Sequence, residues 1–491
     1  MPVIKSPYHT PAPPSTLHHF LADLDQEILI NILPDDVLLE VFDFYVVVDE
    51  DVFDNSVEVW QTLVHVCRRW RSVVFGSPRR LNLRLFYTEK TPARDTLDIW
   101  PSLPLLIRSD HITNVDNIIA VLKCNQRVVK IKLFANNSDL ENVLAAAMQP
   151  FTALTHLELG TFRSRDGTAI LPDSFLGGSA PRLQKLRLRG ILFPGLPKLL
   201  LSATHLVRID LWDIPHSGYF SSEAMVTALS ASISLENLWL QFESPRSRPD
   251  PASRRPPPLT FSVLPALTTF HFKGVTEYLD DIVAHINAPR LNKLDVTFFN
   301  QIVFDTPQLI QFISRTPTLE TLEKALVVFE FGTACVNLSS KTSGYGKLNV
   351  AISCVEFDWQ VSSMEQVCTL CLPPLSTLED VYIYERSYSQ ESQPIWQDIE
   401  NTLWLELLQP FTTVKNLYLS KEFALRIVPA LQELIGGRTT EVLPSLQNIF
   451  LEEPQPPKIR YGIQQFVTTR QVTSHRIAVS QWDRDRSRPE Y

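Results

Sequence analysis

The sequence predicts an α/β protein in which a short helical domain at the N-terminus is joined to a curved solenoid of repeats. Three observations favour this fold class. The pattern L-x-x-L-x-L recurs between residues 128 and 451. Segments with apolar residues at the spacing of an amphipathic helix separate many of its copies. Before the repeats, residues 32–76 carry two apolar stripes with the same helical spacing.

The composition provides ample apolar material for a core and no excess of positive charge. Of the 491 residues, 44% are apolar and 20% are charged, and the formal net charge is −9. This charge argues against general binding to nucleic acid or to an anionic membrane. No stretch approaches the roughly 18 apolar residues of a membrane span, and residues 1–19 lack the apolar core of a signal peptide. We therefore expect an intracellular protein, located in the cytoplasm, the nucleus or both.

The N-terminal helices can be placed from their start signals. Residues 1–20, which many prolines interrupt, are predicted to form a flexible arm, and a helical lead-in is expected over residues 20–29. A helix is then expected to begin at Pro34, whose missing N–H costs nothing in a first turn. Asp35 and Asp36 follow, where the helix dipole favours negative charge.

Two apolar stripes follow this start, and Gly76 with Pro78 marks the end of the second helical run. A helical unit of fewer than about 50 residues cannot bury both stripes within itself, so we expect part of this surface to face a partner. The first stripe comprises Val37, Leu38, Val41, Phe42 and Tyr45, and the second comprises Val59, Trp60, Leu63, Val66, Cys67, Trp70, Val73 and Val74.

These segments together resemble an F-box, the helical module that docks onto the Skp-type adaptor of cullin–RING ubiquitin ligases. The resemblance covers residues 32–75 and rests on Leu33-Pro34 with acids after it, on Val41-Phe42, and on Val66-Cys67-Arg68-x-Trp70-Arg71. One departure is the acidic spacer around residues 49–54, which is longer than the family pattern usually has. The alternative is a helical hairpin that only caps a larger domain.

The resemblance implies that the helical domain, residues 21–76, binds the adaptor and, through it, the cullin scaffold. Truncating one central aromatic of such an interface typically costs about 2 to 4 kcal/mol, so Trp70→Ala is expected to abolish adaptor binding. The adaptor-binding residues that the motif implies are Leu33, Pro34, Val37, Leu38, Val41, Phe42, Val66, Cys67 and Trp70.

The apolar period changes after Pro78. Leu81, Leu83 and Leu85 alternate, which predicts a strand, and residues 103–107 predict another. We expect these two strands to open the next domain, residues 77–453, as its cap.

From residue 128 a repeat governs the sequence. Its copies begin 23 to 32 residues apart up to Leu291, and Leu319 and Leu348 continue the step to Leu378, which gives about a dozen units. The copies that follow the pattern begin at Val128, Leu154, Leu183, Leu206, Leu235, Leu267, Leu291, Leu378, Val414 and Leu446.

Each unit is predicted to hold a short strand with inward apolar positions and a return segment that covers the core. One unit cannot bury its apolar side alone, so neighbours must stack into a curved parallel sheet with helices outside. This arrangement resembles the leucine-rich-repeat solenoid in an irregular form, because the usual Asn or Cys after the strand is mostly absent. Helical returns are expected over residues 142–148, 197–202, 224–232, 280–286, 308–314 and 422–435.

Two segments interrupt the array. Residues 244–258 are rich in Pro and Arg and are predicted to be an exposed loop, either a tolerated insertion or a phosphorylated or recruited segment. Residues 454–491 are predicted to cap the last repeat, with a helix over 459–470 and a strand at 477–479.

No motif predicts a catalytic centre or a cofactor, so we expect a protein that is not an enzyme. The sequence lacks a Gly-x-Ser-x-Gly elbow, a phosphate-binding glycine loop, a His-Glu-x-x-His motif and a calcium loop. Cys368-x-x-Cys371 has no second ligand pair at metal spacing, which favours thiols over a zinc site. The 6 scattered cysteines do not form a disulfide framework.

The solvent side of the strands holds the stronger functional signal. The residue between the last two apolar positions of each copy points to the concave face, and exposed Trp, Tyr and Arg often anchor protein interfaces. Early strands carry a basic patch (Lys130, Lys132, Lys185, Arg187 and Arg189), and later strands carry aromatics. Alternatively, loops cover these side chains or the register is shifted by one. The predicted target-binding residues are Arg187, Arg189, Trp212, Trp239, Tyr382, Tyr384 and Tyr418.

The hypothesis that joins both halves is a substrate receptor of a ubiquitin ligase, whose repeat face holds a protein target that the sequence does not identify. One rival is a repeat protein that sequesters or inhibits a partner and uses its N-terminal helices only as a cap. Another is an enzyme with an unrecognised site, which would need a deep polar pocket.

Overall fold

The structure is a computed structural model that describes residues 33–46, 59–112, 114–162, 168–249, 261–319, 322–340, 347–386, 399–434, 440–473 and 476–483. The predicted arm, the lead-in helix and the acidic spacer lie outside these residues, as does most of the loop at 244–258. The chain divides into two compact units, residues 1–86 with 95–106 and residues 87–94 with 107–491. The domain limits expected at residues 20, 76 and 453 stay predictions.

Helices α3 (Asp35–Val46), α4 (Val59–Val66) and α5 (Arg68–Gly76) build the described part of the first unit. The first begins at Asp35, one residue after the predicted start at Pro34. The second predicted run is wrong as a single helix, because Cys67 adopts extended backbone and interrupts it. Its Sγ accepts a hydrogen bond from the Trp70 amide at 3.4 Å and caps α5.

The core of the first unit is aromatic. The rings of Phe42 and Trp70 lie 4.8 Å apart, and those of Trp60 and Trp100 lie 5.3 Å apart. Trp60 also donates its indole N–H to the Arg84 carbonyl at 3.1 Å. These contacts join α3 to α5, and they join α4 to the chain that follows α5.

The alternation of Leu81, Leu83 and Leu85 does not form the predicted strand. All three side chains are buried, but Leu81 and Leu83 lie in a turn where Asn82 has a φ of +47°. Strand β1 is Leu85–Tyr87 and strand β2 is Leu105–Ser109, so both start later than expected. Burial of alternate residues therefore occurred without strand geometry. The short helix α6 (Ala93–Thr96) lies between them in sequence.

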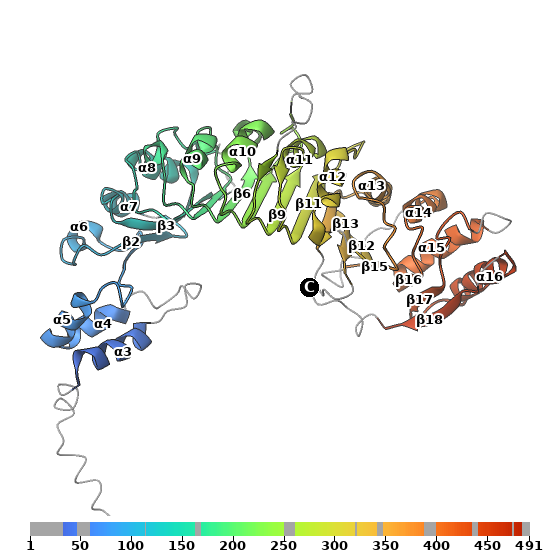
Figure 1. The fold of residues 1–491 in the computed structure, drawn as a ribbon, viewed down its shortest axis with the longest axis horizontal. Helices are drawn as coiled ribbons and strands as arrows, with labels where there is room; N and C mark the ends of the chain where they lie inside the picture. Colours follow the sequence, from blue (N-terminus) through green and yellow to red (C-terminus); the bar gives the residue numbers. More distant parts are fainter. Residues whose placement is uncertain are drawn as a thin grey trace, which may run out of the picture. The chain divides into compact units, whose positions relative to one another are not determined.

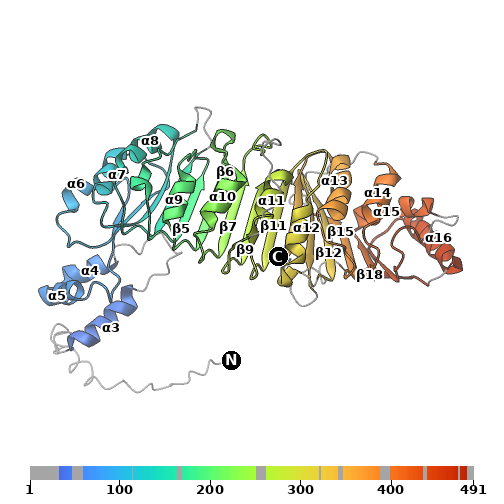
Figure 2. The same ribbon diagram turned by 45° about the horizontal axis from the view of Figure 1, so that its top comes forward.

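The second unit begins with a regular parallel sheet, shown side by side in Figure 2. Each copy of the pattern lies at a strand, and the second and third apolar positions of neighbouring copies pair, as Leu157 does with Leu186. The strands are β3 (Val128–Ala135), β4 (His156–Thr161), β5 (Lys185–Arg189), β6 (Arg208–Ile214), β7 (Asn237–Phe242), β9 (Thr269–Gly274) and β11 (Lys293–Phe299).

Helices cover one face of this sheet and lie on the outer side of its curve in Figure 1. The predicted returns are present, although several begin earlier than expected; α8 starts where the Asn136 side chain accepts from the Asp139 amide at 2.9 Å. The helices are α7 (Val115–Leu122), α8 (Asn137–Ala146), α9 (Leu196–Ser202), α10 (Ser222–Leu229), α11 (Thr276–Val283) and α12 (Pro307–Ser314). A small separate sheet pairs β8 (Ser262–Val263) with β10 (Ile286–Asn287).

The array is interrupted after β11 by an antiparallel meander. Spatial order there is β11-β14-β13-β12-β15, so the chain crosses over two strand positions and then returns through two hairpins. Gly332, with a φ of +80°, turns the first hairpin. The strands are β12 (Lys324–Glu330), β13 (Thr333–Ser339), β14 (Leu348–Ser353) and β15 (Asp380–Glu385), and α13 (Phe357–Leu370) follows β14.

Two predicted repeat starts are corrected by this meander. Leu348 pairs with Leu294, the second apolar position of its unit, and so does not begin a copy. Ala325 pairs with Val381 in the same way, which places the start of that unit at Leu322 rather than Leu319. The spacing between these predicted starts matched the repeat by coincidence, because a hairpin contains about as many residues as a helical return segment.

The last strands are parallel again and end in a cap. The predicted helix at 459–470 and strand at 477–479 are present with slightly different bounds, and the strand pairs with β17. Arg470 is fully buried and donates to the Leu443 carbonyl at 2.6 Å, which fixes the turn before β17. The elements are α14 (Asn401–Leu408), β16 (Asn416–Leu419), α15 (Lys421–Glu433), β17 (Asn448–Glu452), α16 (Pro457–Thr473) and β18 (Ala478–Trp482).

Candidate protein-binding surfaces

Helix α3 exposes a stripe of large apolar side chains. Val41 is 52% exposed and Phe44 is 87% exposed, and the stripe follows the four-residue spacing of one helix side. We call this set the α3 stripe. It consists of Leu33, Val37, Val41, Phe44 and Tyr45.

The other predicted adaptor-binding residues divide by burial. Leu38 and Phe42 are only 1% and 0% exposed and pack in the core of the first unit, so their role in adaptor binding stays a prediction. Trp70 is half-buried against Phe42, and Cys67 is the half-buried cap of α5. Pro34 is exposed beside the α3 stripe in sequence, and Val66 is exposed at the end of α4. An ion pair between Arg69 and Asp35 at 2.7 Å joins α5 to the start of α3.

The sheet of the second unit has a face opposite its helices, which we call the open face. Side chains alternate between the buried helix side and this face along each strand. Across seven neighbouring strands, one predicted row of the open face is in register and the predicted register is confirmed there. That row is Lys132, Glu158, Arg187, Asp210, Trp239, His271 and Asp295.

The first half of the open face is a network of ion pairs rather than a simple basic patch. Arg187 lies between two carboxylates, with Nη1 3.2 Å from Glu158 and Nε 2.9 Å from Asp210. Arg208 reaches the same Asp210 oxygen at 2.8 Å. Burial would lower the pKa of Arg187, but Glu158 and Asp210 outweigh it and raise the pKa.

A bulge adds Asp213 to this network, although strict alternation along β6 would place it with Leu211 on the helix side. The pairing of β6 with β7 shifts register between Leu211 and Ile214, and Asp213 has a φ of +52°. Its carboxylate lies 3.2 Å from Arg189 Nε and accepts a hydrogen bond from the Gln241 amide at 3.1 Å. Only the tolerance of Asp for positive φ could have hinted at this position in the sequence.

Beside the network, aromatic rings stack along the open face. The Trp212 and Trp239 rings lie 4.8 Å apart, and Trp239 and His271 lie 4.0 Å apart. His271 Nδ1 lies 3.1 Å from Asp295, which also accepts a hydrogen bond from Asn349 at 2.8 Å. Burial would raise the pKa of Asp295, but these two hydrogen bonds outweigh it and lower the pKa.

A second aromatic stack lies on the strands after the meander. The ring centroids of Tyr382 and Tyr418 are 4.1 Å apart, and those of Tyr418 and Phe450 are 4.4 Å apart. Burial raises the pKa of Tyr382. Tyr384 is only 6% exposed and belongs to a buried cluster with Trp482, so its role in target binding stays a prediction.

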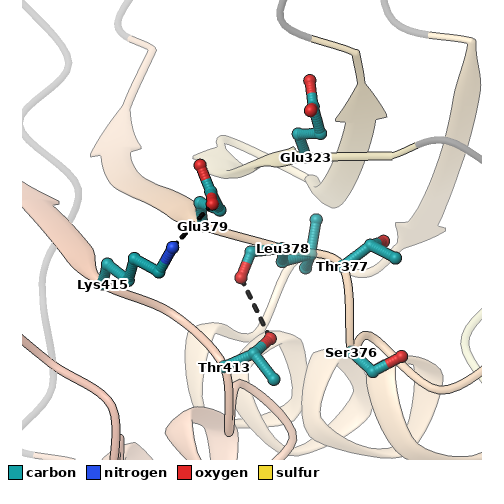
Figure 3. A pocket seen from close by; sticks show the side chains of 7 residues that line it. All are labelled: Glu323, Ser376, Thr377, Leu378, Glu379, Thr413 and Lys415. Carbon is teal, nitrogen blue, oxygen red and sulfur yellow. Dashed lines mark hydrogen bonds and ion pairs between the residues drawn. The ribbon is translucent and has the colours of Figure 1, made fainter.

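Two hollows lie elsewhere on the second unit. The first, of about 340 Å³, lies where the chain enters β12, β15 and β16, and its lining is shown in Figure 3. Lys415 pairs with Glu379 at 2.7 Å, and the Thr413 hydroxyl donates to the Leu378 carbonyl at 3.0 Å. The second, of about 480 Å³, includes Glu365, whose pKa is raised by burial. Neither hollow gathers the groups of a recognisable catalytic site.

The described part of the chain contains neither a metal-binding cluster nor a helix that could span a membrane. Within it, no group of three or more His, Cys, Asp or Glu residues could hold a metal ion. Cys368 and Cys371 are buried free thiols. None of the helices in the described ranges is both long and apolar enough to cross a bilayer.

No family model matches the sequence, that of the F-box included, and no curated protein matches it. Among solved structures, the leucine-rich repeat-containing protein LegL7 from Legionella pneumophila is 12% identical, and the match covers 78% of this chain and 97% of that chain. Its TM-score is 0.25, so we draw no conclusion from it. The repeat architecture follows from the strands, helices and register described above.

Proposed function

We propose that this protein is the substrate-recognition subunit of an SCF-type cullin–RING ubiquitin ligase. In this proposal the first unit binds the Skp-type adaptor, and the open face of the second unit binds a protein target. The single observation that carries the proposal is the α3 stripe, because it exposes contiguous apolar side chains on the helix that resembles the start of an F-box.

The arrangement of α3 supports a docking role over a purely structural one. The helix is apolar on two sides: Leu38 and Phe42 face the core, while Val37, Val41 and Tyr45 face solvent. A helix that only capped a larger domain would need the first side alone. An amphipathic helix side of this kind is a common way to seat one protein on another.

The open face supports the target-binding half of the proposal. Trp212 and Trp239 are half-buried, stacked and held on neighbouring strands, so they can contact a partner at little cost in side-chain entropy. Rigid aromatic and arginine side chains of this kind dominate the energetics of many protein interfaces.

The test is affinity capture of the full chain, with adaptor and cullin measured by mass spectrometry. A Val41→Glu variant should lose both proteins, because it places a charge in the centre of the proposed apolar contact. The matched control is Ile99→Glu, which changes an exposed apolar residue of the same unit outside the α3 stripe. It should capture adaptor and cullin as the wild type does.

The opposite result would be equally clear. Both variants change exposed side chains, so both should remain folded, as circular dichroism would verify. Failure of the wild-type chain to capture the adaptor would overturn the ligase role. The protein would then be better described as a repeat protein that binds or inhibits a partner and uses its N-terminal helices as a cap.

A further inference from the structure

The guanidinium groups of the open face are oriented by buried acids. The Asp210 side chain is 2% exposed, whereas its partners Arg187 and Arg208 are 38% and 39% exposed. Asp213 is 11% exposed, and its partner Arg189 is 50% exposed. The carboxylates therefore lie beneath the arginines, and the cations form the outer layer of this surface.

The geometry leaves part of each arginine available. Arg189 and Arg208 meet their carboxylates through Nε. Within the described residues, the hydrogen bonds of both arginines run through Nε and none runs through a terminal nitrogen. Each guanidinium is thus oriented through its Nε, and its terminal N–H groups point to where an anion could accept hydrogen bonds. Such orientation before binding lowers the cost of binding.

Charge and shape continue from these arginines into the first aromatic stack. Lys130 and Lys132 on β3 and Lys185 on β5 lie on the same face as these arginines. Cations therefore outnumber acids there, although the whole chain has a net charge of −9. Arg189 pairs in register with Trp212, the first ring of the stack. One strip of the open face is therefore cationic at one end and aromatic at the other.

We propose that this strip binds a segment of the target in which acidic residues adjoin apolar ones. The inference rests on the proposed target-binding role of the open face. Residues two apart on a strand are separated by roughly 6.6 Å, so Arg187 and Arg189 are spread along β5. This spread suits a series of side-chain carboxylates better than one compact anion, while Trp212 and Trp239 suit the apolar residues that follow.

The test is selection of random dodecapeptides, displayed on phage, on the immobilised full chain. Enriched peptides should carry Asp or Glu next to aromatic or aliphatic residues. They should bind the Arg189→Gln/Arg208→Gln variant about tenfold or more weakly, because the variant lacks two cations that their acidic residues would contact. The matched control is Arg182→Gln, an exposed arginine in the turn before β5, which should leave the affinity unchanged.

Two results would overturn the inference: enriched peptides without acidic residues, or equal binding to wild type and double variant. A wild-type measurement decides the matter if the double variant does not fold. Affinity for the selected peptides should fall steeply as ionic strength rises, and a salt-independent affinity would exclude the cationic strip. Because both arginines belong to the second unit, acidic peptides selected by a chain that captures no adaptor would refute the ligase role and support this inference.

Discussion

At the residue scale, burial disfavours the thiolate form of four cysteines. Burial raises the pKa of Cys335 and Cys371 to about 12 and that of Cys354 to about 11, and it raises the pKa of Cys368 as well. Only the thiolate is an effective nucleophile, so a raised pKa suppresses reaction at neutral pH.

We expect a thiol reagent such as DTNB at pH 8 to label Cys67 and Cys124, which are half-buried, first in the native protein. Cys335 is also half-buried, but its raised pKa should slow its reaction. At pH 8 we expect Cys335, Cys354, Cys368 and Cys371 to react fully only after unfolding in urea. Because their thiolate forms are disfavoured in the folded state, raising the pH toward 11 should begin to expose Cys354 to reaction first among them. Rapid native labelling of Cys368 or Cys371 at pH 8 would contradict this order.

The acid beneath the arginines should matter for stability. Asp210→Asn keeps the shape of the side chain but removes the charge that Arg187 and Arg208 share. We expect the free energy of unfolding to fall by about 1 to 3 kcal/mol, measured by urea denaturation. Glu141→Gln, an exposed change on α8, should leave it unaltered. Equal midpoints for both variants would show that the network contributes little.

Alternation in the sequence predicted which side chains share the open face but could not predict how deeply each of them is buried. Arg187, Trp239 and Tyr418 lie in the predicted row, because a period of two fixes the face of each residue once the register is known. Tyr384 is on the same side yet buried, since side chains from other strands cover it. The burial of a side chain depends on such neighbours from distant parts of the sequence, which a local pattern does not reveal.

At the element scale, the break between α4 and α5 shows the limit of periodicity. Val59 to Val74 keep a helical spacing through Cys67, so the apolar pattern contains no sign of the interruption. The local signal is weak because Cys is a poor cap compared with Ser, Thr, Asp or Asn.

This break makes a direct prediction. Cys67→Ser should strengthen the cap of α5, because a hydroxyl accepts a hydrogen bond better than a thiol does. Hydrogen–deuterium exchange of the Trp70 amide should slow in Cys67→Ser and accelerate in Cys67→Ala. Similar exchange in both variants would mean that the Sγ contact at 3.4 Å does not hold the start of the helix.

The meander was not predictable for a different reason. Spacing measures how many residues separate two apolar positions, but it does not say whether a helix or a hairpin lies between them. The segment from Leu322 to Val350 uses two hairpins, and its strands return to the sheet in reversed order. Only the pairing partners of β12 and β14 distinguish this path from a simple repeat.

At the scale of the second unit, the repeats form a nearly one-dimensional array. Each strand contacts its neighbours in the sheet, and most return helices pack on the next helix, so stability is expected to be a sum of local terms. The sequence predicted this array and its C-terminal cap because both depend on repeated local patterns. It could not predict how the buried Arg470 holds the cap, since its acceptors lie 27 and 28 residues away.

If stability is a sum of local terms, a destabilising substitution in the cap should affect only the repeats next to it. Arg470→Met removes the donors to the Val442 and Leu443 carbonyls and should loosen the turn before β17. Hydrogen–deuterium exchange should accelerate in β16 and β17, while β4 to β6 keep wild-type rates. Lys458→Met, which changes an exposed lysine on α16, should leave both regions unchanged. Faster exchange along the whole sheet would instead show that the unit unfolds as one cooperative body, and local terms could not then describe its stability.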